Sequence, residues 1–274
     1  MANVTAPFEV RLLAKLRQQI TSRKVGFLLG AGASYLAGRG FPLATAIWPA
    51  IKGTMPPEDQ QRIEGWMARS GHPLEETLDA LDAQYGNDHD LRHRVSTAIA
   101  NSFCCLKPPL DCHQDFVARL SRRSDRIVPV FTLNYDCLVE CGADSAQACL
   151  VDGFCGTFEA SFQPGQFDRA SGNFVLRRGR RVFVPRPGTI SLYKLHGSLG
   201  WFADAQGQLK RMRPDLLCPT GWRRLMIPPQ HRKASDTGFT PYATLWSEFR
   251  AFLSNDTHRL LNRLLSDVHP PCLR

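Results

Sequence analysis

The sequence lacks any apolar segment long enough to cross a bilayer, which takes about 20 residues in a helix. Its longest apolar stretch, residues 25–36, is interrupted by Gly30 and Gly32. The apolar core of a signal peptide is also missing. Apolar residues instead recur every four positions over residues 8–20, between basic ones, which indicates an amphipathic helix. We therefore expect a cytoplasmic protein that makes no contact with a membrane.

Paired cysteines are missing as well. The nine cysteines are an odd number and form no C-x-x-C motif. This spacing argues against a disulfide framework and against a zinc ribbon, which needs four thiolate ligands. Cys137 and Cys141 lie one helical turn apart, but free thiols are the simpler interpretation. We expect reduced thiols and no bound metal.

What remains is the composition of a globular protein. A chain of 274 residues, 43% of them hydrophobic, can bury a sizeable core. Three apolar, β-branched or aromatic runs predict buried strands: Val25–Leu29, Ile127–Phe131 and Ile190–Leu195. The fold class we predict is α/β, a single domain over residues 1–274 built on a Rossmann-like, doubly wound parallel sheet. Loops that follow such strands meet at one edge, where ligands bind.

The segments between these strands differ in character. Residues 44–125 lack strand signals and predict a helical insertion, with Leu74, Leu78, Leu81 and Tyr85 on one helix face. Residues 142–189 are expected to form a basic, irregular region with one short strand at 182–184. Beyond them we expect a strand at 224–227 and a helix over 242–265.

Positive charge is concentrated in one part of the chain. Residues 177–233 contain thirteen Lys or Arg but only Asp204 and Asp215 as acids, in a chain with a net charge of +9. Such a segment suits contact with nucleic acid or with an acidic protein. A solvated loop face is the simple alternative.

The loop after the first strand reads Gly30-Ala31-Gly32-Ala33-Ser34. Glycines between a strand and a helix let backbone N–H groups approach a pyrophosphate. The dehydrogenase fingerprint is excluded because Tyr35 stands at the third glycine position, and a Walker A loop is excluded because no Gly-Lys-Ser/Thr follows. A tight turn without a ligand is the alternative.

Polar residues end the other two strands. The second is followed by Thr132-Leu133-Asn134-Tyr135-Asp136, and the third ends in Lys194-Leu195-His196-Gly197-Ser198. Taken singly, Asn134 is an ordinary helix N-cap and His196 an ordinary turn residue. The three strings in this order, with Gly40-Phe41-Pro42 after the first, resemble the nucleotide pocket of the sirtuin family, which cleaves the nicotinamide–ribose bond of NAD.

The resemblance implies roles for individual residues. Asn134 would position the attacking water, Asp136 would recognise the carboxamide, and His196 would be the general base of the ribose hydroxyl relay. Asn134 and His196 are thus the expected catalytic residues. The expected NAD-binding residues are Gly30, Ala31, Gly32, Ala33, Ser34, Pro42, Thr132, Asp136, Gly197 and Ser198.

The chain departs from the deacylases of that family. It lacks the zinc ribbon, and Leu43-Ala44-Thr45 stands where Asp-Phe-Arg is usual. In this it is similar to the sirtuin-like NADases of bacterial anti-phage defence, which implies an NAD hydrolase that depletes NAD. An NAD-dependent protein-lysine deacylase and a non-catalytic nucleotide-binding or scaffold subunit are the alternatives. The implied partners are NAD, further copies of the chain, and a defence subunit such as a HerA-type ATPase or an Argonaute-like protein.

The last expectation concerns the C-terminal part. Members of that family continue past the helix around Trp246 into a final strand, and no such strand is evident here. We therefore expect the final strand of the sheet to be missing. The uncovered edge would then need a second copy or a partner to cover it.

Overall fold

The computed structural model describes residues 25–71, 73–86, 89–123, 127–157, 159–215, 218–230 and 236–255, the backbone of 259–263, and the single residues Ala14 and Gln18. The amphipathic helix expected over residues 8–20 lies outside these ranges except for those two positions. Among the described helices, none combines the length and the apolar character needed to cross a membrane.

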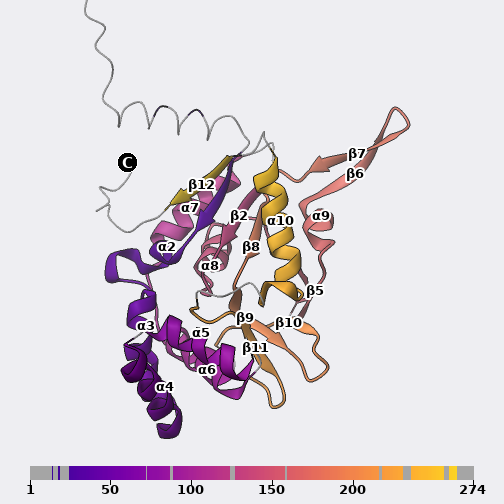
Figure 1. Ribbon diagram of the computed structural model, residues 1–274. Coiled ribbons are helices and arrows are strands. Elements are labelled where there is room, and N and C mark those ends of the chain that lie inside the picture. The colour runs from indigo at the N-terminus through magenta and orange to yellow at the C-terminus, as the bar shows by residue number, and fades with distance from the viewer. Residues whose placement is uncertain are drawn as a thin grey trace, which may run out of the picture.

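A parallel sheet forms the centre of the molecule (Figure 1). All its neighbouring strands are parallel, in the order β12-β1-β2-β8-β3. The strands are β1 (Val25–Leu29), β2 (Val128–Thr132), β3 (Leu150–Val151), β8 (Ile190–Lys194) and β12 (Arg259–Arg263). The predicted strands at 25–29, 127–131 and 190–195 thus correspond to β1, β2 and β8.

Helices cover both faces of this sheet, because alternate strand residues point to opposite sides. On one side Val130 and Leu192 pack with α7 (Asp111–Ser121) and α8 (Leu138–Ser145). On the other side Phe131 and Tyr193 pack with α9 (Gln166–Ser171) and α10 (Tyr242–Ser254). A parallel sheet between two helical layers is the architecture expected of a Rossmann-like α/β protein.

The expectation of a missing final strand was wrong. After α10 the backbone of β12 pairs with β1 in parallel, from Val25↔Arg259 to Leu29↔Arg263. The helix predicted over 242–265 ends at Ser254 accordingly. Because β12 covers β1, the argument that an uncovered β1 edge needs a partner no longer holds.

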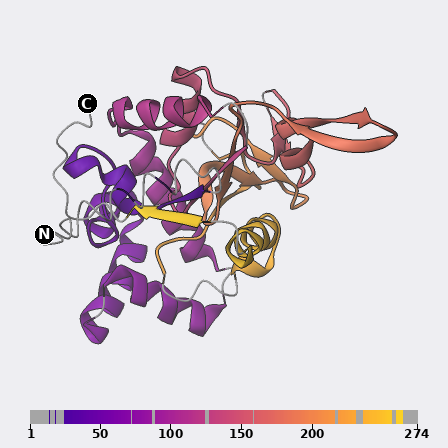
Figure 2. The same cartoon turned by 90° about the horizontal axis from the view of Figure 1, so that it is seen from above.

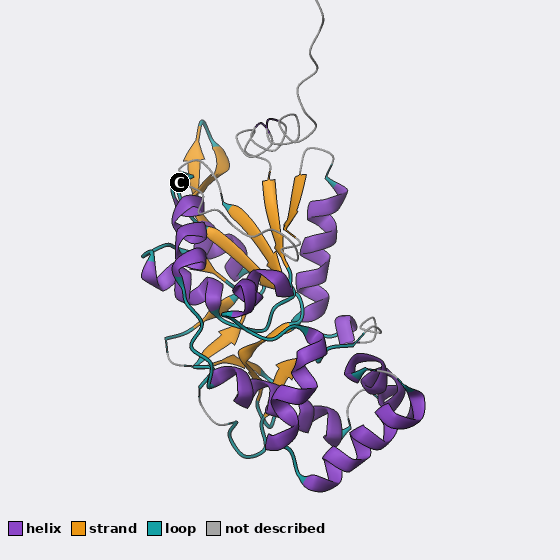
Figure 3. Ribbon diagram, turned by 90° about the vertical axis from the view of Figure 1, so that its left-hand side faces the viewer, coloured by secondary structure: helices purple, strands orange, loops and turns teal. Residues whose placement is uncertain are grey.

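Between β1 and β2 the described residues form helices only. They are α2 (Ala31–Tyr35), η1 (Leu36–Gly38), α3 (Ala44–Ile51), η2 (Lys52–Thr54), α4 (Pro57–Ser70), α5 (Leu74–Tyr85), α6 (Asp90–Cys104) and α7. Elements α3 to α6 lie beyond one end of the parallel sheet (Figures 1 and 3) and share a core to which Leu138, Leu199 and Met226 also contribute. Leu74, Leu78 and Leu81 are buried in it, as predicted, whereas Tyr85 is about half exposed.

A second sheet was not predicted. It is antiparallel, in the order β11-β9-β10-β5-β4. Its strands are β4 (Phe154–Cys155), β5 (Ala160–Phe162), β9 (Gly197–Ala203), β10 (Leu209–Arg211) and β11 (Arg223–Met226). The strand expected at 224–227 is β11. One uninterrupted buried stretch, residues 188–203, runs from β8 in the first sheet into β9 in the second.

The prediction of an irregular region over 142–189 was also wrong, apart from the short strand expected at 182–184, which lies within β7 (Arg180–Pro185). This segment contributes the end of α8, then β3, β4, β5 and α9, and finally the antiparallel hairpin of β6 (Gly172–Arg177) and β7. The hairpin extends away from the body of the molecule in two perpendicular views (Figures 1 and 2). The remaining short element, η3 (Asp236–Gly238), precedes α10.

Candidate functional site

The carboxyl ends of β1, β2 and β8 lie side by side. Backbone pairing continues one residue past the strands, because Leu133 N donates to Leu29 O over 3.0 Å and Leu195 N donates to Thr132 O over 2.8 Å. The loops that begin at Gly30, Leu133 and Leu195 therefore leave the sheet at one edge, where α/β proteins bind ligands.

The glycine loop contains two glycines with opposite surroundings. A Cβ at Gly40 would lie 2.0 Å from Ser34 O, so packing within the chain requires glycine there. The adjacent Phe41 N donates to Ser34 O over 2.8 Å, which holds the segment leading to Pro42 against α2. A Cβ at Gly30, in contrast, would meet no atom of the described residues within 4 Å. The space beside Gly30 is open, at the start of a turn formed by Ala31, Gly32 and Ala33.

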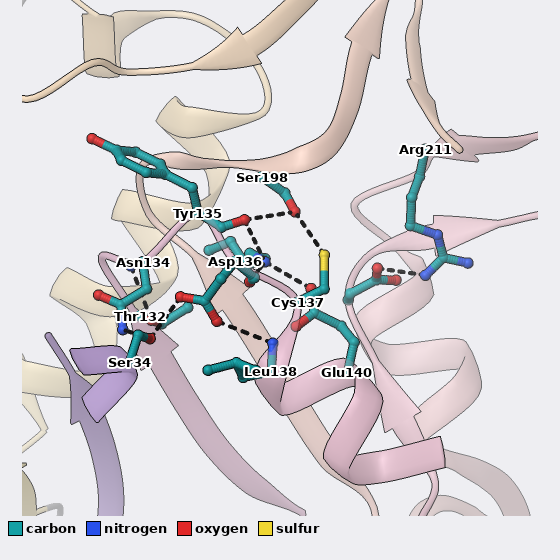
Figure 4. A network of polar contacts seen from close by, with 12 residues as sticks. Ser34, Thr132, Asn134, Tyr135, Asp136, Cys137, Leu138, Glu140, Ser198 and Arg211 are labelled. Carbon is teal, nitrogen blue, oxygen red and sulfur yellow. Dashed lines mark hydrogen bonds and ion pairs between the residues drawn. The ribbon is translucent and has the colours of Figure 1, made fainter. Parts of the chain in front are cut away.

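The Asn134 side chain points toward this loop (Figure 4). Its Nδ2 donates to Gly30 O over 2.9 Å and to Ser34 Oγ over 2.7 Å. A carbonyl oxygen can only accept, so the amide nitrogen must face Gly30 and the oxygen Oδ1 faces away. Thr132 holds the backbone of the same loop, since its Oγ1 donates to Leu29 O over 3.3 Å and accepts from Asn134 N over 3.1 Å.

Asp136 is buried, and both of its carboxylate oxygens are engaged. Oδ2 accepts from Ser34 Oγ over 2.6 Å, and Oδ1 accepts from Leu138 N over 3.0 Å at the start of α8. Ser34 therefore accepts from Asn134 and donates to Asp136, which gives one directed chain of hydrogen bonds. This chain joins the β1 loop to the β2 loop.

Lys194, the last residue of β8, lies on the other side of the Asp136 backbone. Its ammonium group is almost fully buried and donates to Glu140 Oε1 over 2.7 Å and to the carbonyl oxygens of Tyr135 and Asp136. Burial alone lowers the pKa of this lysine, but Glu140, Cys137 and Asp136 together outweigh burial, so the pKa of Lys194 is raised above its ordinary value. The Lys194 ammonium group therefore holds the backbone of the Asn134–Asp136 loop in place.

His196 lies two residues past β8, where the chain passes from one sheet to the other. The residue is buried, and its ring centroid is 6.1 Å from that of Trp246 on α10. Its carbonyl oxygen accepts from Ile227 N over 3.0 Å. The next residue must be glycine, because Gly197 has a φ of +82° and its Cβ would lie 2.2 Å from Leu225 O.

Ser198 is placed away from the glycine loop. Its buried hydroxyl donates to Tyr135 O over 3.3 Å and lies 3.7 Å from Cys137 Sγ, at a distance from Ser34 in Figure 4. Burial raises the pKa of the Cys137 thiol to about 12. The structure therefore brings Ser34, Thr132, Asn134 and Asp136 together. Ser198 does not join this group but holds the loop after β2 through Tyr135 O.

Two buried residues, Lys194 and His113, and the partly buried Glu140 belong to this neighbourhood but were not predicted as site residues. Lys194 entered the prediction only through its motif and the basic segment, and Glu140 did not enter it. His113 on α7 is buried, and its Nδ1 has no hydrogen-bond partner among the described residues. Burial lowers the pKa of His113, although the nearby Asp136 carboxylate opposes that effect. An apolar pattern with an embedded charge is the only sequence signal that could have indicated such groups.

Within the part of the chain that the structure describes, no cluster of three or more His, Cys, Asp or Glu side chains is arranged to hold a metal ion. No protein-family model and no curated protein matches the sequence. The site must therefore be interpreted from its own geometry.

Proposed function

We propose that the chain hydrolyses NAD to nicotinamide and ADP-ribose. The observation that carries the proposal is the open space beside Gly30. The Asn134 side chain lies next to this space, and its amide nitrogen already donates a hydrogen bond to Gly30 O. Packing within the described part of the chain does not require glycine at position 30. A glycine kept at such a position suits the close approach of a phosphate or ribose to the backbone.

The amide oxygen of Asn134 is the group we assign to the nucleophile. Within the described residues it accepts no hydrogen bond, while the nitrogen is fixed by Gly30 and Ser34. Such an oxygen accepts a hydrogen bond from a water molecule and thereby orients the water's lone pair. In the proposed reaction this water forms the new C–O bond at the ribose C1′ as the C–N bond to nicotinamide breaks, and one proton is released to solvent.

His196 is the group we assign to proton transfer. Its backbone is fixed from both sheets, by the preceding Leu195 N to Thr132 O bond and by the Ile227 N to His196 O bond. Histidine titrates closest to neutral pH, which suits a base that acts on a ribose hydroxyl. Asp136 acts in our proposal by holding Ser34 and the start of α8. Both carboxylate oxygens of Asp136 already accept hydrogen bonds within the chain, so we give its contact with the carboxamide of NAD less weight.

A non-catalytic nucleotide-binding subunit is the second candidate. It is favoured by the degree to which Ser34 and Asp136 are satisfied within the chain, since a satisfied network stabilises a fold without needing a substrate. An NAD-dependent protein-lysine deacylase is a third possibility from the sequence, and no contact in the structure favours it. A role in anti-phage defence rests on the resemblance alone.

One experiment separates these functions. The purified chain is incubated with NAD, with and without an acetyl-lysine peptide, and the products are identified by chromatography and mass spectrometry. We expect nicotinamide and ADP-ribose in equal amounts, independent of the peptide. Deacetylated peptide with acetylated ADP-ribose would establish the deacylase. NAD that binds in calorimetry but is recovered intact would establish the non-catalytic subunit.

A further inference from the structure

The β6–β7 hairpin carries a dense group of arginines at its tip. Arg177, Arg178, Arg180 and Arg181 surround the turn, and residues 172–185 contain no Asp or Glu. In the part of the chain that the structure describes, none of the four forms an ion pair with a carboxylate. The positive charge is therefore available to a molecule outside the chain.

The charges lie on both faces of the hairpin. Directly opposite residues of an antiparallel pair share a face, so Arg177 and Arg180 lie on one face. Arg181 lies on the other face with its partner Leu176, and its guanidinium carbon is 5.3 Å from the centre of the Phe174 ring. Arg178 occupies the turn itself. The tip thus carries arginines on both faces of the hairpin and in the turn.

This arrangement works against the stability of the hairpin. Arg177 and Arg180 are paired directly, and like charges in that position repel each other. Arg178 adopts a positive φ of 50° before Gly179 at 76°, where an asparagine or glycine would be unstrained. Local choices that oppose the fold without a gain in packing are characteristic of functional positions.

The hairpin also exposes apolar surface that a folded protein normally buries. Phe174 is 59% exposed and Leu176 is 74% exposed, both on the face that carries Arg181. The hairpin that carries them projects from the body of the molecule (Figure 2). Exposed apolar groups next to unpaired guanidinium groups favour a ligand with both charged and flat apolar parts.

We propose that this hairpin binds double-stranded nucleic acid, with the tip inserted in a groove. A two-stranded ribbon fits the major groove, which is about 12 Å wide. The walls of a groove carry phosphates on both sides, which matches arginines on both faces of the tip. An acidic protein surface would face only one side of the ribbon and leave the opposite guanidinium groups unused. The inference concerns binding and stands apart from NAD cleavage.

The test measures binding of the full chain to a fluorescent DNA duplex of about 20 base pairs, by anisotropy at several salt concentrations. Four phosphate contacts predict a slope of about −4 in log K against log salt. The variant Arg178→Glu/Arg180→Glu is compared with Arg122→Glu/Arg250→Glu, which changes the net charge equally at two exposed positions, one just after α7 and one on α10. We expect the hairpin variant to lose at least about tenfold in affinity and about two units of slope, and the control to keep most of both.

Folding of the variants is checked by circular dichroism and by the melting temperature. The hairpin variant replaces a repulsive Arg177–Arg180 pair with an attractive one, so it should melt at least as high as the wild type. The proposal is wrong if the wild type does not bind the duplex, or if both double variants lose affinity equally. Tighter binding of a single strand of the same length, or of a poly-glutamate peptide, would also overturn it.

Discussion

The Ser34 hydroxyl donates a 2.6 Å hydrogen bond to Asp136 Oδ2, across 102 positions of sequence. The same hydroxyl accepts from Asn134 Nδ2 over 2.7 Å. One side chain of the glycine loop thus holds two side chains of the neighbouring loop at once. The two loops form a single unit at the edge of the sheet, and its stability and activity can be tested separately.

The variant Ser34→Ala should lower the free energy of unfolding by about 1–3 kcal/mol, because it leaves a buried carboxylate oxygen without its donor. Ser254→Ala, at the exposed end of α10, is the matched control and should change stability by less than about 0.5 kcal/mol. Urea denaturation measures both. Equal effects of the two substitutions would show that the Ser34–Asp136 contact contributes nothing specific.

Asn134→Ala and His196→Ala should each reduce NAD cleavage by about a hundredfold or more, the usual scale for groups that orient a nucleophile or transfer a proton. Asn173→Ala on the exposed hairpin is the control for loss of an amide and should leave turnover unchanged. Rates are measured at saturating NAD, with melting curves recorded in parallel. Full activity in either site variant would remove that residue from the proposed mechanism.

Lys194→Met should lower the free energy of unfolding by about 3–5 kcal/mol at neutral pH, since Glu140 and two carbonyl oxygens lose a buried cation. The pKa of Lys194 is raised in the folded state above its ordinary value of 10.5. Its contribution is therefore complete below about pH 10.5 and declines as the pH rises further. Urea denaturation of wild type and variant from pH 7 to 11 measures this, and a difference that grows with pH would contradict it.

Adding Glu140→Met to Lys194→Met should recover part of the lost stability, because no buried charge then remains unpaired. The coupling between the two residues is the readout. Additive losses would mean that the 2.7 Å contact does not join them energetically.

Cys137 should resist alkylation by iodoacetamide at pH 8, because burial raises the pKa of its thiol to about 12 and the thiolate is the reactive form. The exposed Cys105 should react under the same conditions. Peptide mapping by mass spectrometry distinguishes the two sites. Urea should make Cys137 reactive, and equal labelling of both thiols in the native protein would refute the assignment.

The purified protein should contain no stoichiometric zinc, because its cysteines form no C-x-x-C pair. Elemental analysis together with melting curves in a chelator measures this, and the melting temperature should not change. One tightly held zinc per chain would instead return attention to the deacylase alternative.

Three strands of the central sheet, β1, β2 and β8, could be predicted because they are mostly apolar. Runs such as 128–132 and 190–194 are buried on both faces, which leaves a signal in the composition itself. The convergence of the Gly30, Asn134 and His196 loops then followed from the rule for parallel strands. The bond between Ser34 and Asp136 did not, since it depends on how side chains are oriented after packing.

The other strands escaped prediction for physical reasons. The segment of β12 reads Arg-Leu-Leu-Asn-Arg, which is compatible with a helix, and its pairing with β1 overrides that preference. The β6–β7 turn is Arg-Gly and not the usual Asn-Gly, so it gave no hairpin signal. Strands of two or three residues, such as β4 and β5, are defined only by non-local partners.

The uninterrupted buried stretch from residue 188 to 203 has a mechanical consequence. It contributes β8 to the parallel sheet and β9 to the antiparallel sheet, and His196 lies between these two strands. The backbone on either side is tied to different sheets, through Leu195 N to Thr132 O and through His196 O to Ile227 N. The His196 backbone is thus held between the two sheets, so a tilt of the small sheet against the large one would act directly on the backbone that carries the imidazole.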